Sequence, residues 1–219
     1  MPSKDPAFNS AERQAIDLYR TPGQVQKFLN SLPYNKEERG ETLRTFRAVL
    51  KDGQAHCLEA ALTAAVILEQ HGYPPLLLDL ASADRLDHVL FLYRRNGLWG
   101  TVARSRDPGL HGRKPVFATL RRLVESYAEP YVDYTGRIVG YGVADLATLG
   151  NYDWRLSERN AWKVERFLNE IPHRRFHTPN QTYEQWRDRY VGYRKRHPDR
   201  KPLYYRGRYT WMPGYPKNG

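Results

Sequence analysis

The spacing of apolar residues predicts alternating helices and strands in the first two thirds of the chain. Apolar side chains recur at helical spacing over 22–33 and again over 37–49. The segment 57–72 consists of good helix formers, ends at a glycine and is apolar on every side, which is typical of a central buried helix. A further helix is predicted over 120–131, whereas the glycine-rich stretch 135–143 indicates irregular chain.

A strand and a hairpin follow the predicted central helix. The run PLLLDLA is short, apolar and bounded by turn residues, as expected of a strand. Two further strand-like runs flank Asn96-Gly97, the pair preferred in a two-residue type I′ turn. That turn fixes the register of the hairpin. It places His88 opposite Ser105, with Asp107 diagonal to His88 on the same face.

Charge and composition change along the chain. The net charge is +11, and residues 173–219 hold 12 basic and only 3 acidic residues together with seven of the 16 tyrosines. Few aliphatic residues occur there, so this part cannot form a core of its own. We therefore expect a core over 8–145 and a basic, Tyr/Arg-rich extension over 146–219 that docks on the core or stays partly mobile.

Composition also excludes several classes of protein. With 40% hydrophobic residues the chain can build a core, which argues against global disorder. It has no apolar run long enough to cross a bilayer and no signal-peptide pattern, so we predict a cytoplasmic protein without membrane contact. No phosphate loop, dinucleotide fingerprint or metal-ligand spacing occurs, and no cofactor or metal is predicted.

The single cysteine, Cys57, is the main candidate for chemistry. It is either a packed core residue or a reactive thiol. It opens the predicted central helix, where the positive end of the helix dipole favours a thiolate. His88 begins a strand and could serve as the base that assists nucleophilic attack. Gln54 could donate to an oxyanion alongside the Cys57 backbone N–H.

In order and spacing these segments resemble the transglutaminase-like family of the papain-like cysteine hydrolase superfamily. The resemblance covers about residues 22–110: Gly53 and Cys57 open a helix of small residues, then come HGYPP, LLLDLA, the strand beginning at His88, and Trp99 on the next strand. It implies an α+β fold in which a central helix packs on an antiparallel sheet. It also implies Cys57 as nucleophile and His88 as general base and acid.

The third member of the site departs from the family pattern. The family usually has an Asp four residues after the strand tryptophan, and here that position is Ala103. Asp107 is the nearest acidic substitute, and Ser105 could instead hold the imidazole through its hydroxyl group. Either would be a weaker orienter of the imidazole than a well-placed buried carboxylate.

Two functions follow from the sequence. One is a cysteine enzyme that cleaves or transfers at an amide bond of a peptide, protein or other amide substrate through Cys57 and His88. The other is a catalytically impaired binding or scaffold protein. Its tail over 173–219 interleaves Arg and Lys with Tyr and Trp, a pattern that suits nucleic acid or an acidic partner.

Overall fold

The protein is an α+β structure built on one antiparallel sheet. The computed structural model describes residues 7–38 and 40–214. In this part of the chain six strands are hydrogen-bonded in the order β4-β3-β2-β1-β5-β6. Their bounds are β1 Leu76–Ser82, β2 His88–Arg95, β3 Leu98–Val102, β4 Arg113–Phe117, β5 Ile138–Asp145 and β6 Arg174–Arg175.

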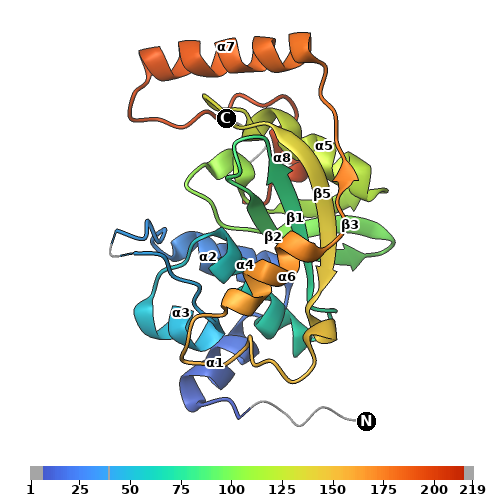
Figure 1. The fold of residues 1–219 in the computed structure, drawn as a ribbon. Coiled ribbons are helices and arrows are strands. Elements are labelled where there is room, and N and C mark those ends of the chain that lie inside the picture. The colour runs from blue at the N-terminus through green and yellow to red at the C-terminus, as the bar shows by residue number, and fades with distance from the viewer. Residues whose placement is uncertain (1–6, 39, 215–219) are drawn as a thin grey trace.

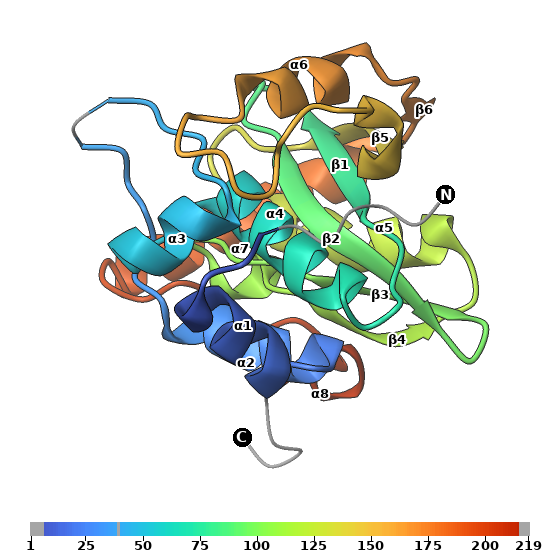
Figure 2. The same cartoon turned by 90° about the horizontal axis from the view of Figure 1, so that it is seen from below.

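Helices cover both faces of the sheet, and each face has its own cluster of buried apolar residues. One cluster joins the sheet to the helices α1, α2, α3, α4 and α6. The other cluster joins the opposite face of the sheet to α5. Figures 1 and 2 show these layers. The helices are α1 Ser10–Leu18, α2 Pro22–Ser31, α3 Phe46–Asp52, α4 Cys57–Glu69, α5 Leu120–Tyr131, α6 Trp162–Glu170, α7 Asn180–Arg196 and α8 Arg208–Trp211, with short 3-10 helices η1 Pro108–Leu110 and η2 Leu146–Leu149.

The predicted central helix is confirmed as α4. Every residue from Leu58 to Leu68 is buried, as expected for a helix that is apolar on all sides. It packs against the β2 face that carries Val89, Phe91 and Tyr93. The strand β1 and the hairpin of β2 and β3 also form where the sequence predicted them.

The helix predicted over 37–49 is wrong in its first half, because only the part from Phe46 onward is helical. Polar side chains bind the backbone of the preceding segment. The Glu37 carboxylate accepts from the Thr42 N–H at 2.8 Å, and the Glu59 carboxylate accepts from the Arg44 N–H at 3.0 Å. These bonds hold the segment in a loop in spite of its apolar spacing.

The irregular chain predicted over 135–143 is also wrong, because β5 runs from Ile138 to Asp145 inside the sheet. It pairs with β1 on one side and with β6 on the other. A Cβ at Gly142 would come within 2.8 Å of Ile171 and 3.1 Å of the His173 ring. The glycine therefore lets the chain after α6 pack close against the strand, which is a recognised use of glycine inside strands.

Gly142→Ala is expected to destabilise the fold by about 1–3 kcal/mol, because the new methyl group would push Ile171 and His173 off the sheet. Urea unfolding measures this loss. Gly140→Ala is the matched control on the same strand. A Cβ there meets its nearest atom at 3.4 Å, so the free energy of unfolding should change by no more than about 0.5 kcal/mol. Equal losses in the two variants would contradict this account.

The expected extension divides into two parts in the structure. Its first part belongs to the main apolar cluster, in which Trp154, Val164 and Leu168 are buried beside α4 residues. The change in composition therefore does not coincide with the edge of the core. The later part, through α7 and α8, lies on the surface of the core and makes specific contacts such as the Arg189–Glu129 ion pair at 2.8 Å.

Candidate functional site

The first turn of α4 places Cys57 at the wall of a cavity. Gly53 ends α3 in a left-handed conformation (φ 67°), and the chain then turns into α4 with His56 as its N-cap residue. The buried carboxylate of Glu59 fixes this turn by accepting from the His56 N–H at 3.0 Å and from the Thr42 hydroxyl at 2.8 Å. Cys57 is partly exposed and lines the cavity.

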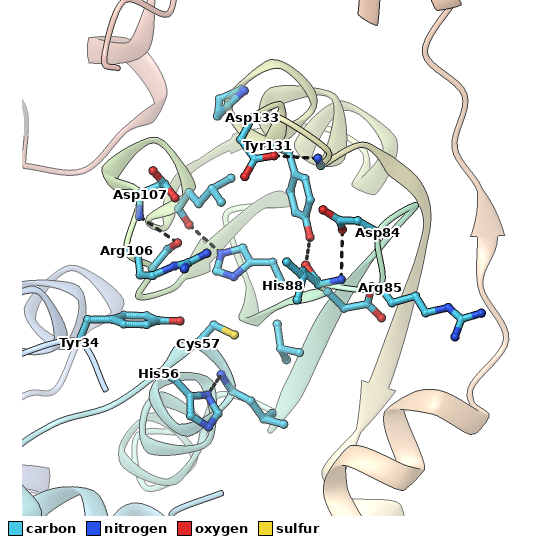
Figure 3. Close-up of a pocket in the computed structure, with 18 of the residues that line it drawn as sticks. Tyr34, His56, Cys57, Asp84, Arg85, His88, Arg106, Asp107, Tyr131 and Asp133 are labelled. Carbon is cyan, nitrogen blue, oxygen red and sulfur yellow. Dashed lines mark hydrogen bonds between the residues drawn. The ribbon is translucent and has the colours of Figure 1, made fainter. Parts of the chain in front are cut away.

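The structure brings Cys57 and His88 together. Burial by itself would raise the pKa of the Cys57 thiol. Hydrogen bonding with His56 and His88, and the charges of the two rings, lower it to about 5. In Figure 3 the sulfur lies between the two rings. A thiol in this environment is a thiolate at neutral pH, which is the nucleophilic form.

A backbone carbonyl holds the other side of the His88 ring. The ring nitrogen Nε2 lies 2.9 Å from the carbonyl oxygen of Leu110 (Figure 3). Since a carbonyl can only accept, Nε2 carries the proton, and Nδ1 is left as the nitrogen that can exchange a proton with the thiol. The orienting group is thus the Leu110 carbonyl, which no side-chain motif could have indicated.

Ser105 and Asp107 have other partners. The Ser105 hydroxyl accepts from the Asp107 N–H at 3.2 Å, and the Asp107 carboxylate pairs with Lys201 at 2.8 Å. The predicted hairpin register is confirmed from the turn as far as the pair Phe91 and Val102, but β3 ends there. The predicted pairing of His88 with Ser105 is therefore wrong, because Ser105 lies beyond the end of β3.

Gln26 of α2 explains why the strand ends at that point. This side chain is 2% exposed and binds both polar groups of the Ala103 backbone, donating to its oxygen at 2.8 Å and accepting from its N–H at 3.0 Å. It also accepts from the Gly112 N–H at 3.2 Å. Gln26 thus takes the place of a hydrogen-bonding partner strand for Ala103 and directs the segment after Val102 out of the sheet. No sequence pattern indicated this role.

Arg113 holds the loop that carries the Leu110 carbonyl. Its guanidinium is fully buried and donates to the carbonyls of Gly109 at 2.9 Å and His111 at 2.7 Å, the residues on either side of Leu110. The guanidinium lies 3.7 Å from the ring centre of Tyr127 and 4.3 Å from that of Trp211. The C-terminal extension therefore contacts the group that positions the acceptor for His88.

His56 contributes both a cap and a nearby ring. Its Nδ1 accepts from the Leu58 N–H at 3.2 Å, and its Nε2 lies 2.9 Å from the Thr42 oxygen. Burial would lower the pKa of His56, whereas Cys57, Glu59 and the Thr42 carbonyl raise it to about 9. Both ring nitrogens of His56 lie against backbone groups, those of Leu58 and Thr42, whereas in the described residues only Nε2 of His88 is bound to the backbone. We therefore assign the exchangeable proton partner of Cys57 to His88.

Tyr34 is a further candidate for an oxyanion donor, beside the predicted Gln54. Gln54 is not among the described residues that line the cavity, whereas Tyr34 is, and its hydroxyl points toward Cys57 in Figure 3. A parallel bridge between Tyr34 and Ala55 brings the two segments together. Burial, reinforced by the charge of Cys57, raises the pKa of Tyr34, so its hydroxyl keeps its proton and remains a donor. The sequence did not single out Tyr34, because its position near Cys57 depends on this pairing between two separate segments.

The cavity has a volume of about 770 Å³, within the range of small-molecule and short-peptide sites. Its walls come from distant parts of the chain. The α4 turn and the start of β2 form one side, α6 contributes Leu168, and the extension contributes Tyr190, Pro202 and Tyr205. The site is therefore incomplete without the residues that follow the region of resemblance.

Asp79, which lines the cavity, forms an acid–histidine pair with His173. The carboxylate oxygen Oδ2 of Asp79 lies 2.9 Å from His173 Nε2, and His173 Nδ1 lies 3.0 Å from the Ile171 carbonyl. Burial raises the pKa of Asp79 to about 6; hydrogen bonding and charge from His173 lower it, and the charges of Asp87 and Cys57 raise it. The pattern of the β1 sequence indicated only an apolar strand here.

No protein-family model matches the chain, and the search of curated proteins finds no match either. Within residues 7–38 and 40–214, no three or more His, Cys, Asp or Glu side chains are grouped so that they could hold a metal ion. In the same described ranges, no helix has both the length and the apolar character needed to cross a membrane.

Proposed function

We propose that the protein is a cysteine-dependent enzyme that cleaves or transfers at an amide bond, on a core of the transglutaminase-like, papain-like type. One observation carries the proposal. A thiol of lowered pKa lies beside a histidine whose far nitrogen is fixed by a carbonyl, and both line a cavity large enough for a substrate. Nucleophile, base and orienting group in this relation are the parts of base-assisted acyl transfer.

The first chemical step would form a thioester. The Cys57 thiolate attacks the amide carbon, and the Cys57 backbone N–H and the Tyr34 hydroxyl stabilise the oxyanion. When the oxyanion collapses, the C–N bond breaks and His88 gives its proton to the leaving amine. Water or an amine then attacks the thioester, loses a proton to His88 and expels the Cys57 thiolate, which regenerates the enzyme.

The Leu110 carbonyl limits this machinery in one respect. It fixes the ring of His88 as a carboxylate would, but it carries no charge, so it stabilises the imidazolium less. We therefore expect a slower reaction than a buried aspartate at this place would support. The position of the ring, and hence the direction of proton transfer, is nevertheless defined.

The basic extension remains a predicted contact for nucleic acid or an acidic partner. Its aromatic rings, however, are largely used within the protein. Tyr190 and Tyr205 are buried, and the Arg189 guanidinium lies 4.1 Å from the ring centre of Tyr204. Rings held in this way are poorly placed to stack on bases. The contacts of the extension therefore favour a role in building the cavity.

A screen with a peptide-amide library tests the proposed function. The wild-type protein is incubated with the library with and without a small primary amine, and products are identified by mass spectrometry. We expect a free acid, or an amide of the added amine, that does not form with Cys57→Ala. Equal product from the wild type and Cys57→Ala, or no product with any member of the library, would reject the proposal.

A further inference from the structure

The cavity is acidic although the protein as a whole is basic. Among the described residues that line it, seven are Asp or Glu and three are Lys or Arg, beside the two histidines His56 and His88, whereas the chain carries a net charge of +11. Asp87 and Glu165 belong to this set and come from distant segments, just before β2 and in α6. Because a cleft lined by one sign of charge concentrates the opposite charge, this wall favours a cationic ligand.

Asp79 supplies a buried acceptor without a partner at this cavity. The residue is 3% exposed and lines the cavity, and its Oδ1 atom has no hydrogen-bond partner among the described residues. A buried carboxylate oxygen without a partner is costly. The close approach allowed by Gly142 holds His173 on the other oxygen, so Oδ1 is the one left for a ligand.

Oδ1 is an acceptor whichever group of the pair holds the proton. The two neighbours of the His173 ring, the Ile171 carbonyl and the Asp79 carboxyl group, lie at hydrogen-bond distance from its two nitrogens. With His173 as imidazolium, Asp79 is a carboxylate. With the proton on Asp79 Oδ2, the neutral carboxyl group still offers Oδ1 as a carbonyl oxygen.

We propose that the cavity binds a substrate that carries a primary ammonium group, and that Asp79 Oδ1 accepts a hydrogen bond from it. A single free oxygen suits an ammonium, which donates as a compact point charge. A guanidinium favours two oxygens side by side, and here the second oxygen is taken by His173. This inference rests on the proposed function, because it places the charged group beside the bond that Cys57 attacks.

Three thiol reagents of different charge test the inference without requiring turnover. In each case the Cys57 thiolate attacks the sulfenyl sulfur of a methanethiosulfonate, forms a mixed disulfide and releases the sulfinate. The aminoethyl reagent carries an ammonium, the methyl reagent is neutral and the sulfonatoethyl reagent is anionic. Cys57 is the only cysteine, so all labelling reports this site. Rates are measured at pH 7 and divided by those of a small free thiol.

We expect the aminoethyl-to-methyl rate ratio to exceed that of the free thiol by about tenfold, and the sulfonatoethyl reagent to be disfavoured. Asp79→Asn should lower the ratio by about threefold or more, since its amide oxygen would face His173 and its amide N–H, a donor, would take the place of the acceptor Oδ1 at nearly constant shape. Taking the ratio within each variant cancels changes in the thiolate itself. Asp17→Asn, an equal change of charge at an exposed site on α1, should leave the ratio unaltered.

Glu165→Gln keeps the inference testable if Asp79→Asn fails to fold, because Glu165 is exposed on α6 and also lines the cavity. It should lower the ratio in the same direction. A wild-type ratio equal to that of the free thiol, or one that neither variant lowers, would overturn the inference. Ammonium preference without any amide product would reject the proposed function alone, and turnover without charge preference would reject this inference alone.

Discussion

Replacing His88 with Asn is expected to raise the pH at which Cys57 becomes reactive. In the wild type the midpoint of alkylation by iodoacetamide should lie near pH 5, with the reactive thiolate present above it and lost below. Without the ring, the thiolate loses its positive neighbour and a hydrogen bond, and the midpoint should move up by about 1–3 pH units. A series of alkylation rates from pH 4 to pH 10 measures both midpoints.

The midpoint is the quantity to measure, because the rate at a single pH is ambiguous. A thiol of low pKa provides more thiolate, but that thiolate is intrinsically less nucleophilic, and the two effects largely cancel near neutral pH. Absorbance of the thiolate near 240 nm gives an independent titration of the one cysteine. Agreement between the two titrations would show that the kinetic midpoint belongs to Cys57.

His56→Asn is the matched control for this prediction. Asparagine is a preferred N-cap residue, so the substitution keeps the cap of α4 and removes the ring. Because Nδ1 of His56 already accepts from the Leu58 N–H, we expect this variant to move the midpoint less than His88→Asn does. A larger shift in His56→Asn would assign the proton partner of the thiolate to His56 instead.

Arg113→Met is expected to cost about 3 kcal/mol or more of folding free energy. The guanidinium donates to the carbonyls of Gly109, His111 and Ser126. The Tyr127 hydroxyl still donates to His111 in the variant, but the Gly109 and Ser126 carbonyls would each lose this donor at about 1–3 kcal/mol. For a chain of this size the loss corresponds to a fall in Tm of about 6–12 °C. Thermal unfolding followed by circular dichroism measures it.

Arg121→Met provides the comparison for Arg113→Met. Arg121 pairs with Glu125 on the surface of α5, where an ion pair contributes little, so its loss should change stability by no more than about 0.5 kcal/mol. In the folded fraction of Arg113→Met, the loop with the Leu110 carbonyl loses its clamp, and the alkylation midpoint of Cys57 should also rise. An unchanged midpoint would show that the loop holds His88 without Arg113.

The parts of the site that the sequence could predict are those fixed by local patterns. An all-apolar helix preceded by a glycine-containing loop located Cys57 at the helix start, and the Asn96-Gly97 turn located β2 and its register. Both patterns depend only on residues that are close together in the sequence. The groups that act on these residues, such as Gln26 on the Ala103 backbone, come from segments that no local pattern connects.

β5 is an example from the fold of a feature that the local sequence could not predict. Its glycines indicated irregular chain, because isolated glycine weakens a strand. In the structure Gly142 lies under Ile171 and His173, which belong to a segment about 30 residues later in the chain. A glycine that is needed for close packing and a glycine that marks a loop look alike until the packing partner is known.

Local residue patterns were enough to predict that Cys57 opens a buried helix, that His88 begins a strand of an antiparallel hairpin, and that the last part of the chain is basic and aromatic. The packing of distant segments was needed to find that the Leu110 carbonyl orients the imidazole and that the cavity beside Asp79 is rich in acidic residues. Every residue has a backbone carbonyl, so the role of one carbonyl depends on its position in space. A local electric field, likewise, sums charges from distant segments and does not follow the net charge of the chain.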